Sequence, residues 1–211
     1  GLTVKHRLFI YALIAIFGSW WFYYKLDFDF VRIPFVGLIN MGWYFIPFFI
    51  FIIIATAFSV NEADGLDGLA AGIVLAAFTS YGTIAFMQGS YNLATFCGVI
   101  SGSLLAFLWF NINPARFFMG DTGAMSLGIA LGIVAILTGY PLLLPIIGFL
   151  LLLESLSVII QVLSKKIRNK KVFLSAPIHH HFEAKGWPET KVVMRFWVIS
   201  AVAAVLGLII A

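Results

Sequence analysis

The sequence FFMGDTG, residues 117–123, places a single carboxylate between two long apolar runs. The glycines on either side of Asp121 allow a tight turn and a close approach of the backbone to a ligand. A carboxylate among oxygen acceptors suits a hard cation such as Mg²⁺, which prefers oxygen ligands and phosphate partners. The alternative is that Asp121 only caps the helix that follows, because Asp is common at that position. The rest of the chain bears on this choice.

The composition of the 211-residue chain is that of an integral membrane protein. Hydrophobic residues make up 62% and charged residues only 10%, with a mean hydropathy of +1.05, whereas a soluble domain carries about 25% charged residues. The single cysteine, Cys97, lies in an apolar run, which excludes a disulfide framework. The net charge of +4 does not indicate a nucleic-acid partner, because the basic residues stand beside apolar runs.

Seven apolar runs are long enough to cross a bilayer, which takes about 17–25 residues. They are 8–24, 43–60, 69–87, 92–110, 122–139, 141–163 and 192–211. We therefore predict an all-α polytopic membrane protein with about seven transmembrane helices, forming a single domain over residues 1–211. Alternating residues in 26–42 predict a short external hairpin. Two GxxxG patterns, Gly98–Gly102 and Gly128–Gly132, favour close packing within the bundle over dimerisation, although a homodimer stays open.

The distribution of Lys and Arg predicts that the N-terminus and three loops, 61–68, 111–121 and 164–191, face the cytoplasm. In this orientation only Lys25 and Arg32 of the thirteen basic residues lie outside. Most acidic residues and all four histidines also fall on the inner side. We therefore expect a multi-pass membrane protein whose chemistry faces the cytoplasm, where nucleotide-linked substrates occur.

The first two inner loops carry the acidic and aromatic residues. In NEADGLDG, residues 61–68, Asp64 and Asp67 are three residues apart and can share one face of a helical turn. Three clustered acids repel one another, so a metal or a donor-rich ligand explains them better than a hydrated turn. In the second loop, Phe118 either stacks on a nucleobase or packs at the membrane interface.

The third inner loop opens with a basic cluster, which favours an anchor touching anionic lipid. Three adjacent histidines, His179, His180 and His181, follow. Adjacent residues do not face one point on a helix or strand, and zinc-binding helices use i, i+4 spacing, so we favour hydrogen-bonding and phosphate-facing roles over a metal site. Glu154 lies within an apolar run and is expected to face the bundle and bond a neighbour, because exposure to lipid is costly.

Three stretches together resemble the phospho-N-acetylmuramoyl-pentapeptide transferases of the polyprenyl-phosphate sugar-1-phosphate transferase superfamily. They are NEADGLDGL at 61–69, FNINPARFFMGDTG at 110–123 and PIHHHFEAKGW at 177–187, with RFW at 195–197. The first two stretches are typical of the superfamily, and the histidine stretch is much more specific. The resemblance covers essentially the whole chain.

The family has ten spans and an adjacent Asp pair in an earlier loop. The resemblance therefore leads us to expect that this chain corresponds to the C-terminal two-thirds of the family fold and is inactive alone. Glu62-Ala63 departs from the family's usual Leu-Thr, which adds a carboxylate beside the site.

The resemblance implies a role for nine residues and one cofactor, Mg²⁺. The implied metal site contains Asp121 and Asn61. The implied catalytic residues are Asp64, Asp121, His179 and His180. The implied substrate-binding residues are Asp67, which faces the uracil, Phe118, which stacks on it, and Asn111 and His181.

The resemblance also implies the reaction: transfer of phospho-N-acetylmuramoyl-pentapeptide from its UDP-linked donor to undecaprenyl phosphate, with release of UMP. The nucleophile is mostly dianionic at pH 7, because the second pKa of a phosphate monoester is about 6. The main difficulty is the repulsion between two anions, which cations must offset during an in-line displacement.

Two alternatives remain. The first is a transferase for N-acetylhexosamine 1-phosphate that uses the same lipid, against which the histidine stretch argues. The second is an ion or metal transporter, which would require ionisable residues in mid-span, where only Glu154 stands.

Overall fold

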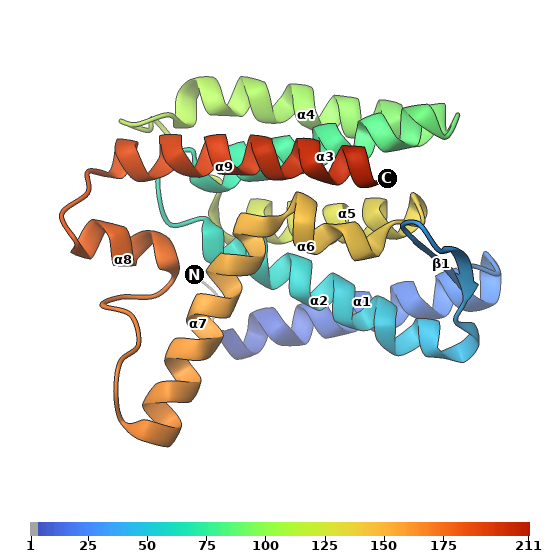
Figure 1. Cartoon of the computed structure of the whole chain (residues 1–211), viewed down its shortest axis with the longest axis horizontal. Helices are drawn as coiled ribbons and strands as arrows, with labels where there is room; N and C mark the ends of the chain where they lie inside the picture. Colours follow the sequence, from blue (N-terminus) through green and yellow to red (C-terminus); the bar gives the residue numbers. More distant parts are fainter. Residues whose placement is uncertain (1–3) are drawn as a thin grey trace.

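The computed structural model describes residues 4–211, in which long helices run side by side and a two-stranded hairpin lies at one end (Figure 1). The elements in chain order are α1 (Val4–Lys25), β1 (Phe30–Ile33), β2 (Gly37–Asn40), η1 (Gly42–Tyr44), α2 (Phe45–Ala63), α3 (Leu69–Met87), α4 (Tyr91–Asn111), α5 (Gly120–Leu137), η2 (Pro141–Leu143), α6 (Leu144–Ile147), α7 (Phe149–Arg168), α8 (Ile178–Ala184) and α9 (Glu189–Ile210).

Six helices in the described part of the chain are long and apolar enough to cross a membrane, or up to seven if a bent pair counts as one span. This confirms the prediction of an all-α, multi-pass membrane protein. The predicted hairpin is also present, with β1 and β2 antiparallel and Phe30 opposite Asn40.

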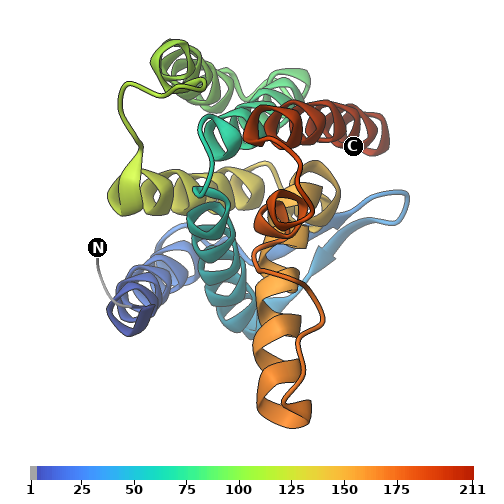
Figure 2. The same cartoon turned by 90° about the vertical axis from the view of Figure 1, so that its left-hand side faces the viewer.

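The apolar run predicted as a span over 141–163 does not form one straight helix. The segments Pro141–Ile147 and Phe149–Arg168 meet at an angle of 84°. Gly148 between them has a non-helical backbone, with φ −95° and ψ 33°. Beyond the bend, α7 inclines away from the other helices in both views (Figures 1 and 2). The bend could not be predicted from the sequence, because the run is mainly apolar and glycine permits a turn without requiring one.

Helix α2 packs between its neighbours α1, α5 and α7. A Cβ added at Gly128 would lie 2.6 Å from the Cα of Ala57, so this glycine lets α5 approach α2 closely. The prediction of close packing is therefore confirmed for Gly128–Gly132. It is wrong for Gly98–Gly102, where an added Cβ would meet no described atom within 4 Å.

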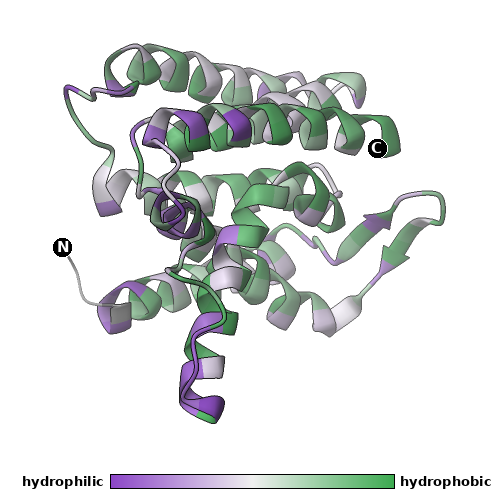
Figure 3. Cartoon of the chain, turned by 60° about the vertical axis from the view of Figure 1, so that its left-hand side comes forward, coloured by the Kyte–Doolittle hydropathy of each residue, from purple (hydrophilic) through white to green (hydrophobic). Residues whose placement is uncertain are grey.

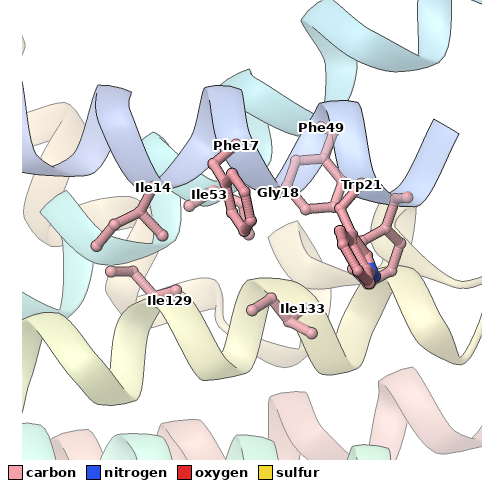
Figure 4. A pocket seen from close by; sticks show the side chains of 9 residues that line it. Ile14, Phe17, Gly18, Trp21, Phe49, Ile53, Ile129 and Ile133 are labelled. Carbon is pink, nitrogen blue, oxygen red and sulfur yellow. The ribbon is translucent and has the colours of Figure 1, made fainter. Parts of the chain in front are cut away.

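An apolar cleft of about 320 Å³ lies between α1 and α5, over α2 (Figure 4). Its walls include Phe17, Trp21, Ile129 and Ile133. The cleft carries no ionisable side chain among its lining residues, so it offers no chemistry.

The three predicted inner loops gather at one end of the bundle, opposite the hairpin (Figure 1). Hydrophilic residues are concentrated in α8, at the start of α9 and at the free end of α7, whereas the long helices are mainly hydrophobic (Figure 3). The fold thus presents its polar loops on one face of an apolar bundle.

Candidate active site

A polar cavity of about 240 Å³ lies where α2 ends and α5 begins. Six residues predicted from the sequence line this cavity: Asn61, Asp64, Asp67, Asn111, Phe118 and Asp121. The first two inner loops, about 50 residues apart in the chain, therefore build one site. The three histidines are not among its lining residues.

Asp121 lies in the first turn of α5, which begins at Gly120 with a left-handed φ of +68°. Asn61 Nδ2 donates to Asp121 Oδ1 at 3.2 Å. The guanidinium of Arg7, on α1, donates to Asn61 Oδ1 and lies 3.4 Å from Asp121 Oδ1. A carboxylate, an amide and a guanidinium from three helices thus meet at one point.

Arg7 was not predicted as a site residue. The sequence analysis counted it only in the charge distribution, because it lies 54 residues before Asn61. A basic residue at the polar end of an apolar helix is ordinarily an anchor. Two features of the sequence could have indicated Arg7. The acidic loop 61–68 lacks a cation of its own, and the start of α1 was predicted to lie at the same end of the bundle as this loop.

Asp64 is a partly buried carboxylate whose pKa is raised to about 6. Burial is the main cause, and the charge of Asp121 adds to it, while the hydrogen bond from the Gly120 N–H acts in the opposite direction. A cation in the cavity would favour the ionised form of Asp64.

Asp67 is fixed by the second inner loop. The Ala115 N–H and Asn113 Nδ2 both donate to Asp67 Oδ2 at 3.0 Å. Glu189, at the start of α9, accepts from the Asp67 N–H at 2.7 Å and from Asn113 Nδ2 at 3.1 Å. The sequence analysis missed Asn113 and Glu189, because their hydrogen bonds join residues far apart in the chain and leave no local pattern in the sequence.

Asn111 is 95% buried and links the two loops rather than standing open in the cavity. Its Oδ1 accepts from the Gly68 N–H at 3.0 Å, and its Nδ2 donates to the Phe117 carbonyl at 2.9 Å. Gly68 is also held by α9, because Trp197 Nε1 donates to its carbonyl at 3.1 Å. The substrate contact predicted for Asn111 therefore remains a prediction, beside a clear bracing role.

The two adjacent phenylalanines have different surroundings. Phe117 packs against Phe107 and Phe110, with ring centroids 5.3 and 5.7 Å away. Phe118 is 72% exposed and lines the cavity. An exposed ring beside a polar cavity is a stacking surface.

The three histidines of α8 have three different partners, as adjacent positions on a helix require. His179 Nδ1 lies 3.0 Å from the buried carboxylate of Glu154, which confirms that Glu154 faces the bundle and bonds a neighbour. His180 Nδ1 lies 2.6 Å from Glu183 Oε2. His181 Nδ1 accepts from the backbone N–H of Leu174 at 3.1 Å.

His179 lies behind the acidic loop rather than in the cavity. It is fully buried, and its Nε2 edge rests against Gly65, which leaves no room for a Cβ there. His180 and His181 are partly exposed on the same short helix. The structure thus gives His179 a supporting place and leaves the other two within reach of solvent.

The donor set of the cavity fits Mg²⁺. Asp64, Asp121 and the amide of Asn61 offer only oxygen ligands, which a hard cation prefers. Within residues 4–211 there is no group of three or more His, Cys, Asp or Glu side chains placed to hold a metal ion. Any cation here would therefore share its coordination with an amide, substrate phosphates or water.

Comparison with known proteins gives a consistent result. The family model described as glycosyl transferase family 4 matches residues 1–139. The phospho-N-acetylmuramoyl-pentapeptide-transferase of Bartonella quintana (strain Toulouse) is 45% identical over 225 aligned residues, which cover 99% of this chain and 63% of the relative. The proteins of the same name from Pelagibacter ubique (strain HTCC1062) and Acetivibrio thermocellus are 42% and 43% identical, covering 99% and 98% of this chain and 63% and 64% of the relatives. The chain thus spans somewhat under two-thirds of the length of these relatives.

Proposed function

This chain belongs to glycosyl transferase family 4, and from that premise we propose that it transfers phospho-N-acetylmuramoyl-pentapeptide from its UDP-linked donor to undecaprenyl phosphate. The names of the relatives support the identity of the transferred sugar-phosphate group. The observation that carries the proposal is the polar cavity, where Asp64, Asp121 and Phe118 meet at the end of an apolar bundle. Such a place admits a water-soluble nucleotide and a lipid phosphate together.

The reaction is a displacement at the sugar-linked phosphorus of the donor. A phosphate oxygen of undecaprenyl phosphate forms a new P–O bond to that phosphorus, and the P–O bond to UMP breaks. The nucleophile is already largely dianionic at pH 7, so no strong general base is required. The residues of the site therefore serve mainly to hold two anions in line.

Arg7 is the cationic side chain that the structure places at the carboxylate end of the cavity. We assign it the role of offsetting the negative charge that accumulates as the two phosphates approach. Asp121, Asn61 and Asp64 would hold Mg²⁺. When bound, the ion neutralises diphosphate charge and orients the leaving group.

Phe118 and Asp67 form the nucleoside end of the site. The exposed Phe118 ring can stack on uracil, and Asp67, held by Asn113 and Ala115, can accept from the base N–H. His180 and His181 are assigned to the sugar-phosphate side because their α8 is partly exposed beside the acidic loop. His179 is assigned a supporting role from its burial.

The multi-pass bundle places this site at a membrane boundary, and we propose that the boundary is the cytoplasmic face of the inner membrane. The bias of Lys and Arg toward the end of the bundle that carries the acidic loops supports this orientation. UDP-linked donors are made in the cytoplasm, so the orientation also agrees with the proposed chemistry.

Donor selectivity tests the proposal. The protein expressed from its complete gene is purified and given undecaprenyl phosphate with either UDP-N-acetylmuramoyl-pentapeptide or UDP-N-acetylglucosamine. We expect lipid-linked product from the muramoyl donor at a rate at least about 100-fold higher, the discrimination that a few missing contacts produce. Faster turnover of UDP-N-acetylglucosamine would instead establish the hexosamine alternative.

A further inference from the structure

Helix α7 has an unusual place in the fold. After the 84° bend it runs away from the other helices, and its C-terminal end lies far from the bundle in both views (Figures 1 and 2). The following chain, 169–177, folds back along it (Figure 2). We call the end of α7 from residue 161, with this returning chain, the α7 tip.

The α7 tip is fixed by hydrogen bonds. Gln161 is buried, and its Oε1 accepts from the backbone N–H groups of Val172 and Phe173, both at 3.0 Å. Its Nε2 donates to the Phe173 carbonyl at 2.9 Å. Ser164 Oγ donates to the Lys170 carbonyl at 2.9 Å. The α7 tip therefore holds its side chains in a defined arrangement.

The charge of the α7 tip has one sign. Five exposed basic residues stand within seven positions: Lys165, Lys166, Arg168, Lys170 and Lys171. The sequence contains no Asp or Glu between residues 155 and 182. Lys165 of the helix and Lys171 of the returning chain line one cavity of about 240 Å³, together with Ser175. The positive charges of these two side chains repel each other, and an anion bound between them would offset this repulsion.

The outer side of α7 is apolar. Leu156, Ile160, Leu163 and Ile167 follow one another at helical spacing, and each is between 39% and 75% exposed. Lys and Arg at the end of such a stripe are typical of helices that lie in the membrane interface. The basic end appears in Figure 3 as hydrophilic colour at the free end of α7.

We propose that the α7 tip binds the headgroup phosphate of an anionic phospholipid in the leaflet on the side of the acidic loops. Lys165 and Lys171 hold the phosphate, and the hydroxyl of Ser175, which lines the same cavity, donates to it. The apolar stripe lies against the acyl chains of the same leaflet. A phospholipid satisfies both features at once, whereas a free phosphate would satisfy only the cavity. The inference is independent of the transfer reaction, because the cavity of the α7 tip shares no lining residue with the polar cavity.

Lipid binding to the full-length protein tests this proposal. The protein in neutral detergent at about 0.15 M salt is titrated with phosphatidylglycerol or phosphatidylcholine, and retained lipid is counted by native mass spectrometry. The variant K165Q/K171Q is compared with K166Q/K170Q, which removes the same charge from the same tip without altering the lining of the cavity. Circular dichroism confirms that both variants stay helical.

We expect phosphatidylglycerol to bind K165Q/K171Q about 25-fold more weakly than wild type, since one Lys near an anionic surface contributes about fivefold. The K166Q/K170Q variant should lose no more than about fivefold, because neither side chain lines the cavity and exposed charges outside it are partly screened at this salt concentration. Equal losses in the two variants would overturn the proposal in favour of diffuse attraction. Equal binding of phosphatidylcholine, or displacement of the lipid by inorganic phosphate at the same concentration, would overturn it as well.

Discussion

Gly65→Ala is a sharp test of how the acidic loop is supported. Gly65 lies between the cavity residue Asp64 and the buried ring of His179. An added Cβ would lie 3.0 Å from His179 Cε1 and closer still to Nε2. The backbone at Gly65 is not left-handed, so the substitution acts through space rather than through backbone strain.

The magnitude follows from the distances. Ordinary carbon contacts lie at about 3.5–4.0 Å, so the loop or the ring must move by between about 0.5 and 1 Å. The ring is fully buried and held by Glu154, so we expect the loop to move. A displacement of about 1 Å at a reacting site costs roughly 100-fold in rate, which corresponds to about 2.7 kcal/mol in the barrier.

The assay is transfer by the full-length protein, with UMP release followed over time. Gly98→Ala serves as the matched control, because an added Cβ there meets nothing within 4 Å. A second comparison uses Gly65→Ala on a His179→Ala background, where the clash is removed and the further loss should be small. A Gly65→Ala enzyme within about threefold of wild type would refute the reasoning, and so would an undiminished Gly65→Ala effect without the ring.

Three further predictions concern single side chains of the site. Phe118→Ala should weaken the binding of uridine nucleotides by about 1–3 kcal/mol and leave the KM for undecaprenyl phosphate unchanged. The two effects are measured by UMP binding and by steady-state kinetics. Equal losses for both substrates would mean that the Phe118 ring only packs. Burial raises the pKa of Asp64 to about 6, so ionising it costs folding free energy, and the contribution of Asp64 to the stability of the wild type falls as pH rises from about 4 to about 6. The melting temperature of Asp64→Asn relative to wild type should therefore climb across that window and level off above it, and a difference that stays constant with pH would contradict this cause. His180→Ala should lower turnover without weakening Mg²⁺ binding, because the His180 ring is paired with Glu183 and does not line the cavity. A loss of Mg²⁺ affinity as large as that of Asp121→Asn in a Mg²⁺ titration would contradict the assignment.

Much of the fold could be predicted because apolar runs and turn residues are local signals. The span predicted at 69–87 coincides with α3, and other spans differ from their helices by a few residues. The bend at Gly148 was missed because glycine also occurs inside straight helices. The open face at Gly98 was missed because a GxxxG spacing records the possibility of close packing and not the partner.

The site was predictable where its residues cluster in sequence. Asp64 and Asp67 share one loop, and Phe118 and Asp121 share another, so their chemistry could be read directly. Arg7 could not be found in this way, because its place at the site depends on how α1 packs against α2. The three histidines have different hydrogen-bond partners because their surroundings differ. For example, Glu154 of α7 contacts His179.

The central claim is that Asp121, in the polar cavity, is required for transfer of the sugar phosphate to the lipid phosphate. The direct measurement gives the full-length protein radiolabelled UDP-N-acetylmuramoyl-pentapeptide, undecaprenyl phosphate and Mg²⁺, and counts UMP and lipid-linked product together. Wild type should form both in equal amounts, and Asp121→Asn should lose at least about 100-fold while remaining membrane-inserted. Asp29→Asn, beside the hairpin at the other end of the bundle, should match wild type. Near-normal UMP release by Asp121→Asn at the same Mg²⁺ concentration would contradict the account.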